Sequence, residues 1–225
     1  MKCDLCPRKC LVDRKKGEKG ICGQTENLKV ARAALHFWEE PCISGDAGSG
    51  AVFFSGCPLH CVFCQNENIA NGTVGKEISL ERLVDIFLEL QEKRANNINL
   101  VTPGHFVPQI VKALDQARRE GLTLPVVYNT SSYETVDTIK MLEGYVDIYL
   151  PDFKYMSPVL SKKYSHAPDY AEVTKAAIAE MVRQTGKAVF VNGEEDNLIL
   201  SGTIVRHLTL PGCMADSMQI LKYLH

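Results

Sequence analysis

Short apolar runs bounded by turn residues recur along the chain from about residue 50 onward. Runs of this length that are rich in β-branched and aromatic residues are typical of buried strands. Five of them predict strands: GAVFFSG (50–56), INLV (98–101), LPVVYN (124–129), VDIYL (146–150) and GTIVRHLTL (202–210).

Between these runs, apolar residues recur at helical spacing. Ser79 can cap a helix in which Leu80, Leu83, Phe87 and Leu90 share one face. The same periodicity predicts helices over 107–121, 136–142 and 170–184, and a short one at the end of the chain.

Strands that alternate with helices indicate βαβ units and a parallel sheet. Five clear repeats are too few to close an eight-stranded barrel. We therefore expect an α/β fold, an open or partial (β/α) barrel over residues 49–225. Functional residues of such sheets gather at the carboxyl ends of the strands. The polar segments that follow the first four strands are 57–64, TPGH (102–105), NTSS (129–132) and PDFK (151–154).

Residues 1–48 show little periodicity and are rich in cysteine and glycine, which predicts a small segment held together by a bound metal. The chain has 225 residues, of which 45% are hydrophobic, so it can bury a sizeable core. Its net charge of -2 predicts no binding to nucleic acid or to an anionic membrane. No signal peptide or membrane span is evident, and we expect a cytoplasmic protein with reduced thiols.

Eight of the nine cysteines lie in the first 64 residues, which favours metal or cluster ligation over disulfides. Cys57, Cys61 and Cys64 have the spacing C-x3-C-x2-C, directly after the first predicted strand. Three thiolates on a four-iron cluster leave one iron open to another ligand. A zinc site is the alternative, with His60 or Cys42 as the fourth ligand.

A second set of cysteines lies at the N-terminus, with the spacing C-x2-C-x3-C-x11-C: Cys3, Cys6, Cys10 and Cys22. Four thiolates satisfy a tetrahedral zinc ion or a fully ligated iron-sulfur cluster equally well. We expect these four residues to share one metal centre, of either kind. Cys42 and Cys213 are expected to be inert.

The C-x3-C-x2-C motif, with Phe63 before its last cysteine, resembles the signature of the radical S-adenosylmethionine (SAM) enzymes. Further segments look like those of proteins related to pyruvate formate-lyase activating enzyme: EEPCISGDAGSGAVFFSGCPLHCVFCQN, NLVTPGHFVPQI, PVVYNTSSYETV, VDIYLPDFKY and IVRHLTLPG. The resemblance implies a partial barrel, a 4Fe-4S cluster on the three cysteines, and SAM bound to the open iron. Related proteins run longer at the C-terminus, so we expect a fragment or a shortened member.

The resemblance also implies residue roles. Asp152 and Lys154 match an Asp-x-Lys segment that lies beside SAM and are the expected catalytic pair. Asn129 and Thr130 match an Asp-Thr pair at a cation site, where the asparagine removes a negative charge. The remaining residues expected around SAM are Phe63, Thr102 and Arg206, with Thr102 in a segment that replaces a Gly-Gly-Glu motif.

The implied activity is reductive cleavage of SAM to a 5′-deoxyadenosyl radical for hydrogen abstraction, as in an activase of a glycyl radical enzyme. Its expected partners are that enzyme and an electron donor of flavodoxin or ferredoxin type. Two alternatives stay open: a radical SAM enzyme that acts on a small molecule or peptide, and a non-catalytic iron-sulfur or zinc-binding protein.

Overall fold

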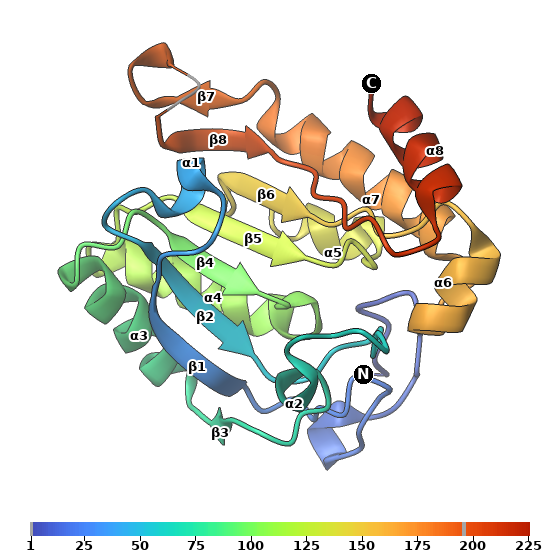
Figure 1. The fold of residues 1–225 in the computed structure, drawn as a ribbon. Helices are drawn as coiled ribbons and strands as arrows, with labels where there is room; N and C mark the ends of the chain where they lie inside the picture. The colour runs from blue at the N-terminus through green and yellow to red at the C-terminus, as the bar shows by residue number, and fades with distance from the viewer. Residues whose placement is uncertain (1, 195–196) are drawn as a thin grey trace.

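The computed structural model describes residues 2–194 and 197–225 and forms an α/β fold around one mixed sheet (Figure 1). Among these residues the sheet has eight strands, in the order β3-β1-β2-β4-β5-β6-β8-β7. The strands are β1 (Lys29–His36), β2 (Ser49–Phe54), β3 (Lys76–Glu77), β4 (Ile98–Val101), β5 (Val126–Thr130), β6 (Ile148–Pro151), β7 (Val189–Phe190) and β8 (Ile199–Thr203). The helices are α1 (Pro41–Ser44), α2 (Glu67–Ala70), α3 (Leu80–Glu92), α4 (Val107–Arg119), α5 (Val136–Lys140), α6 (Pro158–Ser165), α7 (Tyr170–Thr185) and α8 (Met214–Leu224).

The parallel centre of the sheet confirms the predicted fold class. β2, β4, β5, β6 and β8 pair in parallel, and the described sheet does not close into a barrel. β1 pairs antiparallel with β2 from His36↔Ser49 to Val30↔Phe54, which the sequence pattern did not indicate. We placed a boundary at residue 48, but β1, which lies before it, and β2, which lies after it, are neighbours in one sheet.

The last predicted strand, 202–210, is wrong in its extent. β8 ends at Thr203, and hydrogen bonds to the β6 segment continue only through Ile204 and Arg206. Beyond Asp152 the β6 segment turns away toward α6, so no neighbouring strand remains to pair with. The His207 side chain instead contacts Phe153 O at 2.7 Å and Ser217 Oγ of α8 at 2.8 Å.

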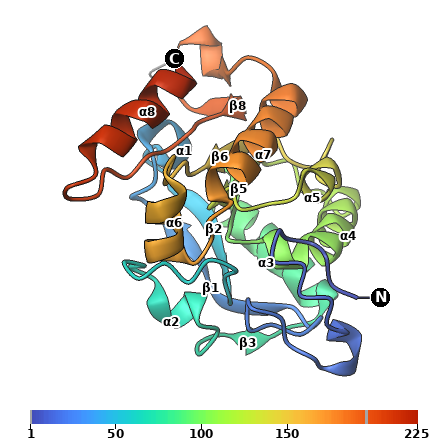
Figure 2. The same cartoon turned by 90° about the vertical axis from the view of Figure 1, so that its right-hand side faces the viewer.

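The alternation of side chains along the strands divides the core in two. Leu100, Tyr128 and Tyr149 pack into the main core, on the face that α3, α4, α5 and α7 cover (Figure 2). Val127, Ile148 and Leu150 point to the other face and pack against Ile43 of α1. The second face also carries Asn99, Asn129 and Asp152, whose contacts are described below. Polar side chains therefore gather on this face, and α1 covers one end of it.

The N-terminal segment lies beside the carboxyl ends of the parallel strands (Figure 1). Its Arg14 is buried, donates to His105 O at 2.6 Å and to Thr25 O, and lies over the Phe106 ring. These contacts fix the segment against the loop that follows β4. None of the described helices is long and apolar enough to cross a membrane.

Candidate functional site

The loop that follows β2 carries the three closely spaced cysteines. Cys57, Cys61 and Cys64 are each half-buried. The backbone N–H groups of Leu59 and His60 lower the pKa of Cys57. The Cys61 sulfur accepts a hydrogen bond from Ser165 Oγ at 2.9 Å. N–H and O–H donors aimed at sulfur stabilise the thiolate form, which is the form that binds iron.

The three thiols interact electrostatically. Burial raises the pKa of Cys57 to about 11, and the charges of Cys61 and Cys64 add to the rise. Burial also raises the pKa of Cys61, while Ser165 and the Lys154 ammonium lower it. A bound iron atom would replace the proton of each thiol, so the donor set fits a cluster.

A single metal ion fits this loop less well than a cluster. Over residues 2–194 and 197–225, no three His, Cys, Asp or Glu side chains are arranged to hold a metal ion. The nitrogen atoms of His60, the proposed fourth zinc ligand, already face Ile21 O at 2.8 Å and Asn71 Oδ1 at 3.2 Å. The four irons of a cluster span more space than one ion and do not require the sulfur atoms to converge on a point.

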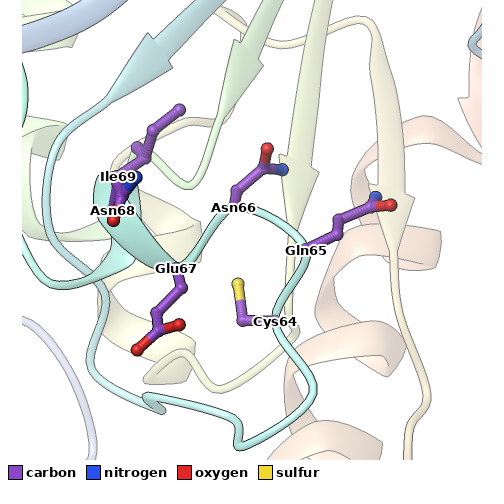
Figure 3. Close-up of a pocket in the computed structure, with 6 residues that line it drawn as sticks. All are labelled: Cys64, Gln65, Asn66, Glu67, Asn68 and Ile69. Atoms are coloured by element: carbon purple, nitrogen blue, oxygen red, sulfur yellow. The ribbon is translucent and has the colours of Figure 1, made fainter.

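Cys64 opens onto a hollow of about 400 Å³ (Figure 3). Its sulfur points to the inside of the arc formed by Gln65, Asn66 and Glu67, which then enters α2. Residues 65–68 are exposed, so the hollow is reached from solvent. The third thiol of the set therefore faces open space.

Arg206 lies at the centre of a polar network on the α1-side face of the sheet. Its Nη1 is 2.8 Å from Glu39 Oε1, its Nε is 3.0 Å from Asp152 Oδ1, and its Nη2 donates to Asn129 Oδ1 at 2.7 Å. Lys154 Nζ is 2.6 Å from Asp152 Oδ2. Four of the predicted site residues, Asn129, Asp152, Lys154 and Arg206, are thus brought together, from the ends of three strands.

The network reaches the cysteine loop through Lys154. The ammonium lowers the pKa of Cys61, so the two groups interact electrostatically. Phe63 packs edge-on against Tyr155 and Tyr164, with ring centroids 6.4 Å apart in each case. Tyr155 is hydrogen-bonded to Ser165, the donor to Cys61. The cysteine loop and the charged network therefore form one site at the carboxyl ends of the strands.

Glu39 is a member of this network that sequence reasoning missed. Its Oε2 accepts the side-chain amides of Asn99 and Asn129, each at 3.0 Å. Burial raises the pKa of Glu39, while Arg206 acts against that rise. Glu40 also lies 3.6 Å from Arg206. Asn99, a polar residue inside an otherwise apolar strand, indicates a polar partner on this face, but nothing in the sequence identifies that partner as Glu39.

Two predicted residues lie outside the network. Thr130 follows Asn129 in β5, so its side chain lies on the opposite face, where its hydroxyl donates to Glu134 Oε1 at 2.8 Å. Burial raises the pKa of that carboxyl to about 7. Thr102 lies at the end of β4 in a left-handed conformation, with φ of 55°, and its backbone N–H donates to Asn129 O.

The four N-terminal cysteines interact electrostatically, although they do not converge as a single metal ion requires in the described residues. Cys6 and Cys22 are buried, and burial raises the pKa of Cys6 to about 12, with further contributions from Cys22 and Cys10. Cys3 and Cys10 likewise contribute to the raised pKa of Cys22. Cys42 packs against the α1 core cluster, and Cys213 lies in the loop before α8.

Comparison with known proteins shows similarity to a family model and to a protein from an archaeon. Residues 51–197 match the model of the Radical SAM superfamily, a span that includes Cys57–Cys64, Asn129, Asp152 and Lys154. The chain is also 28% identical over 215 residues to the uncharacterized protein MJ0674 of Methanocaldococcus jannaschii. That match covers 93% of this chain and 57% of the relative, so the chain spans little more than half the length of that protein.

Proposed function

This chain belongs to the radical SAM superfamily, and we propose that it activates a glycyl radical enzyme by hydrogen abstraction. Membership implies a SAM-dependent enzyme with a 4Fe-4S cluster. When bound and reduced, that cluster supplies the electron that cleaves SAM into methionine and a 5′-deoxyadenosyl radical. One observation carries the proposal: the three-cysteine loop lies next to the charged network of Lys154, Asp152 and Arg206 at one end of the sheet.

The cysteines hold the cluster in this proposal, and the charged network holds SAM. Cys57, Cys61 and Cys64 supply three thiolates and leave one iron free. Lys154 and Arg206 present cationic groups for a carboxylate, and Asp152 presents anionic oxygen for the ammonium or sulfonium of SAM. Phe63 and its two tyrosine neighbours shield the cluster from solvent on one side.

An exposed rim supports a macromolecular substrate. The segment 65–68 beside Cys64 is exposed and borders the hollow of about 400 Å³. The described sheet also stays open instead of closing around the site. An extended glycine-bearing loop of a partner could approach such a rim. A radical SAM enzyme that acts on a small molecule would be expected to enclose its substrate more fully.

The proposal also includes a cellular compartment that keeps the cysteines reduced and a protein that donates electrons to the cluster. We place the enzyme in the cytoplasm, as an oxidoreductase that receives electrons from a flavodoxin- or ferredoxin-type donor. We also propose that the N-terminal cysteines bind a second iron-sulfur cluster or a zinc ion.

Product analysis tests the proposed activity. The protein is reconstituted anaerobically with iron and sulfide, reduced with dithionite and incubated with SAM. We expect 5′-deoxyadenosine from the wild type and from Cys42→Ala, whose thiol packs against the α1 core cluster. Cys61→Ala should form none. Lack of the product in the wild type would exclude the radical SAM reaction and leave a non-catalytic metal-binding role.

A deuterium experiment distinguishes the substrate classes. The reduced enzyme and SAM are incubated with a glycyl radical enzyme of the pyruvate formate-lyase type that carries deuterated glycine. Transfer of deuterium into 5′-deoxyadenosine, together with a glycyl radical signal, supports the activase. Formation of 5′-deoxyadenosine without deuterium would favour a small-molecule or peptide substrate.

A further inference from the structure

N–H groups lie near the sulfur atoms of the N-terminal cysteines. The backbone N–H groups of Arg8 and Gln24 lower the pKa of Cys6 and of Cys22, against the rise that burial causes. Cys10 accepts the backbone N–H of Ile21 at 3.3 Å. The Cys3 sulfur lies 3.9 Å from Arg14 Nη1. Among the described residues these four sulfur atoms do not converge as a single metal ion requires. An iron-sulfur cluster, whose irons span more space, is therefore the group that this ligand set fits.

The backbone turns around these cysteines are held by bonds of their own. Cys3 and its neighbours form a short ladder, with Cys3 N donating to Val12 O and Leu11 N to Cys3 O, each at 2.9 Å. Gly20 lies against Cys10, where an added Cβ would come within 3.1 Å of the sulfur. The thiols are therefore fixed by the chain and do not hang free in solvent.

The same segment contacts the loop that carries the SAM-cluster cysteines. Gly56, directly before Cys57, has a φ of 91°, and a Cβ there would lie 2.4 Å from Cys22 O. Within the loop, His60 Nε2 lies 2.8 Å from Ile21 O. The residues around Cys22 thus touch the loop both before and after Cys57.

Arg8 makes the third connection from its position between Cys6 and Cys10. Its Nε donates to Pro58 O at 2.9 Å, and Nη1 and Nη2 donate to His166 O and Ser165 O at 2.5 and 3.1 Å. Ser165 is the residue whose hydroxyl donates to the Cys61 sulfur. One guanidinium therefore ties the N-terminal segment to two sides of the three-cysteine site.

We propose that Cys3, Cys6, Cys10 and Cys22 bind one four-thiolate iron-sulfur cluster, whose role is to position the Cys57–Cys64 loop for its own cluster. The positioning role rests on the proposed function, whereas the N-terminal cluster does not. Four thiolates close the coordination of a cubane, so this centre offers no open position for a substrate. Arg8 is a positioning residue: through its hydrogen bonds the ordered N-terminal segment holds the loop in place.

The first experiment isolates the N-terminal centre. A variant with Cys57, Cys61 and Cys64 all changed to alanine is loaded separately with zinc and with iron plus sulfide, and the bound metal is counted. We expect one cluster per chain from the loading with iron and sulfide, which is lost on adding Cys10→Ala, and no stoichiometric zinc. Absence of a cluster after that loading, or one bound zinc ion per chain, would overturn the proposed N-terminal cluster, whatever the activity of the enzyme.

The second experiment measures the positioning role through loss of iron from the SAM cluster. Reconstituted wild type, Cys10→Ala and Arg8→Gln are challenged with an iron chelator, and the SAM-sensitive paramagnetic signal is followed. We expect the signal to decay about 10-fold faster in both variants, as for other residues that support metal ligands. Arg8→Gln should keep the N-terminal metal. Arg32→Gln, on the exposed part of β1, is the matched control and should decay like the wild type.

Three outcomes decide between the possibilities. Decay of Arg8→Gln at the rate of Arg32→Gln would overturn the positioning role, and this comparison is decisive even if Cys10→Ala fails to fold. Faster decay with N-terminal metal retained supports it. Failure of the wild type to form any cluster on Cys57–Cys64 would overturn both the positioning role and the proposed function, while the metal count of the triple variant would still stand.

Discussion

Replacement of Arg206 by methionine is expected to destabilise the fold through the carboxylates that it leaves behind. Arg206 contacts Glu39, Asp152 and Asn129 at once, and the Glu39 side chain is only 12% exposed. Removal of one partner of a buried ion pair costs about 3–5 kcal/mol. Because Arg206 is itself 25% exposed and Asp152 keeps Lys154, we expect about 3 kcal/mol, the lower end of that range.

Arg82→Met provides the matched control. Arg82 also faces two carboxylates, Asp85 and Glu89, but all three side chains are about half exposed on α3. Solvent-exposed ion pairs of this kind contribute little to stability, so Arg82→Met should cost far less than Arg206→Met. Urea denaturation followed by circular dichroism measures both variants at equal ionic strength. Equal losses for Arg206→Met and Arg82→Met would refute the claim that the network is a buried charge cluster.

The pH dependence gives a second readout of the same variant. Burial already raises the pKa of Glu39, and loss of Arg206 removes a cation that lowers it. The folded variant therefore favours protonated Glu39, and its deficit relative to the wild type should shrink as pH falls toward the ordinary range of a glutamate. Adding Glu39→Gln to Arg206→Met should restore part of the lost stability at neutral pH. A deficit that is independent of pH would contradict this reading.

Two further substitutions test other parts of the account. Gly56→Ala should lower the unfolding free energy by about 2 kcal/mol more than Gly121→Ala, as measured by urea denaturation. A Cβ at Gly56 would lie 2.4 Å from Cys22 O, whereas Gly121, also at positive φ, has nothing within 4 Å. Equal losses would argue against the close contact of the two cysteine segments. Burial raises the pKa of Glu134 to about 7, so the fold prefers its protonated form, and the unfolding free energy of the wild type should fall by about 3 kcal/mol as pH rises from 4.5 to above 7. Glu134→Gln should not show this fall. Parallel curves of stability against pH for the two proteins would show that Glu134 does not titrate in this range.

The sequence predicted the strands that are buried on both faces and missed those that are not. β4, β5 and β6 are mainly apolar runs, interrupted by Asn99, Asn129 and Thr130, as expected where helices and the α1 segment cover both sides. β1 mixes basic residues with alanine and is mostly half-buried, so its composition carries no strong period. β3 and β7 have two residues each, which is too short for any pattern.

The site shows a similar division. The cysteine spacing and the position of Asp152 and Lys154 after a strand could be read directly, because both depend on neighbouring residues. Glu39 meets Arg206 across 167 positions of the chain, and no local spacing signals such a pair. Thr130 was grouped with Asn129 by resemblance, although the two-residue period of a strand already places adjacent side chains on opposite faces.

A SAM titration of the reduced cluster tests the central claim most directly. The claim is that Cys57, Cys61 and Cys64 leave one iron open and that SAM binds there. The clusters are reconstituted in the wild type, and the paramagnetic resonance spectrum is recorded as SAM is added. The spectrum of the variant with Cys57, Cys61 and Cys64 all changed to alanine is subtracted as the contribution of the N-terminal cysteines. We predict a changed spectrum that saturates at one SAM per chain. A spectrum that stays unchanged at saturating SAM would contradict the account.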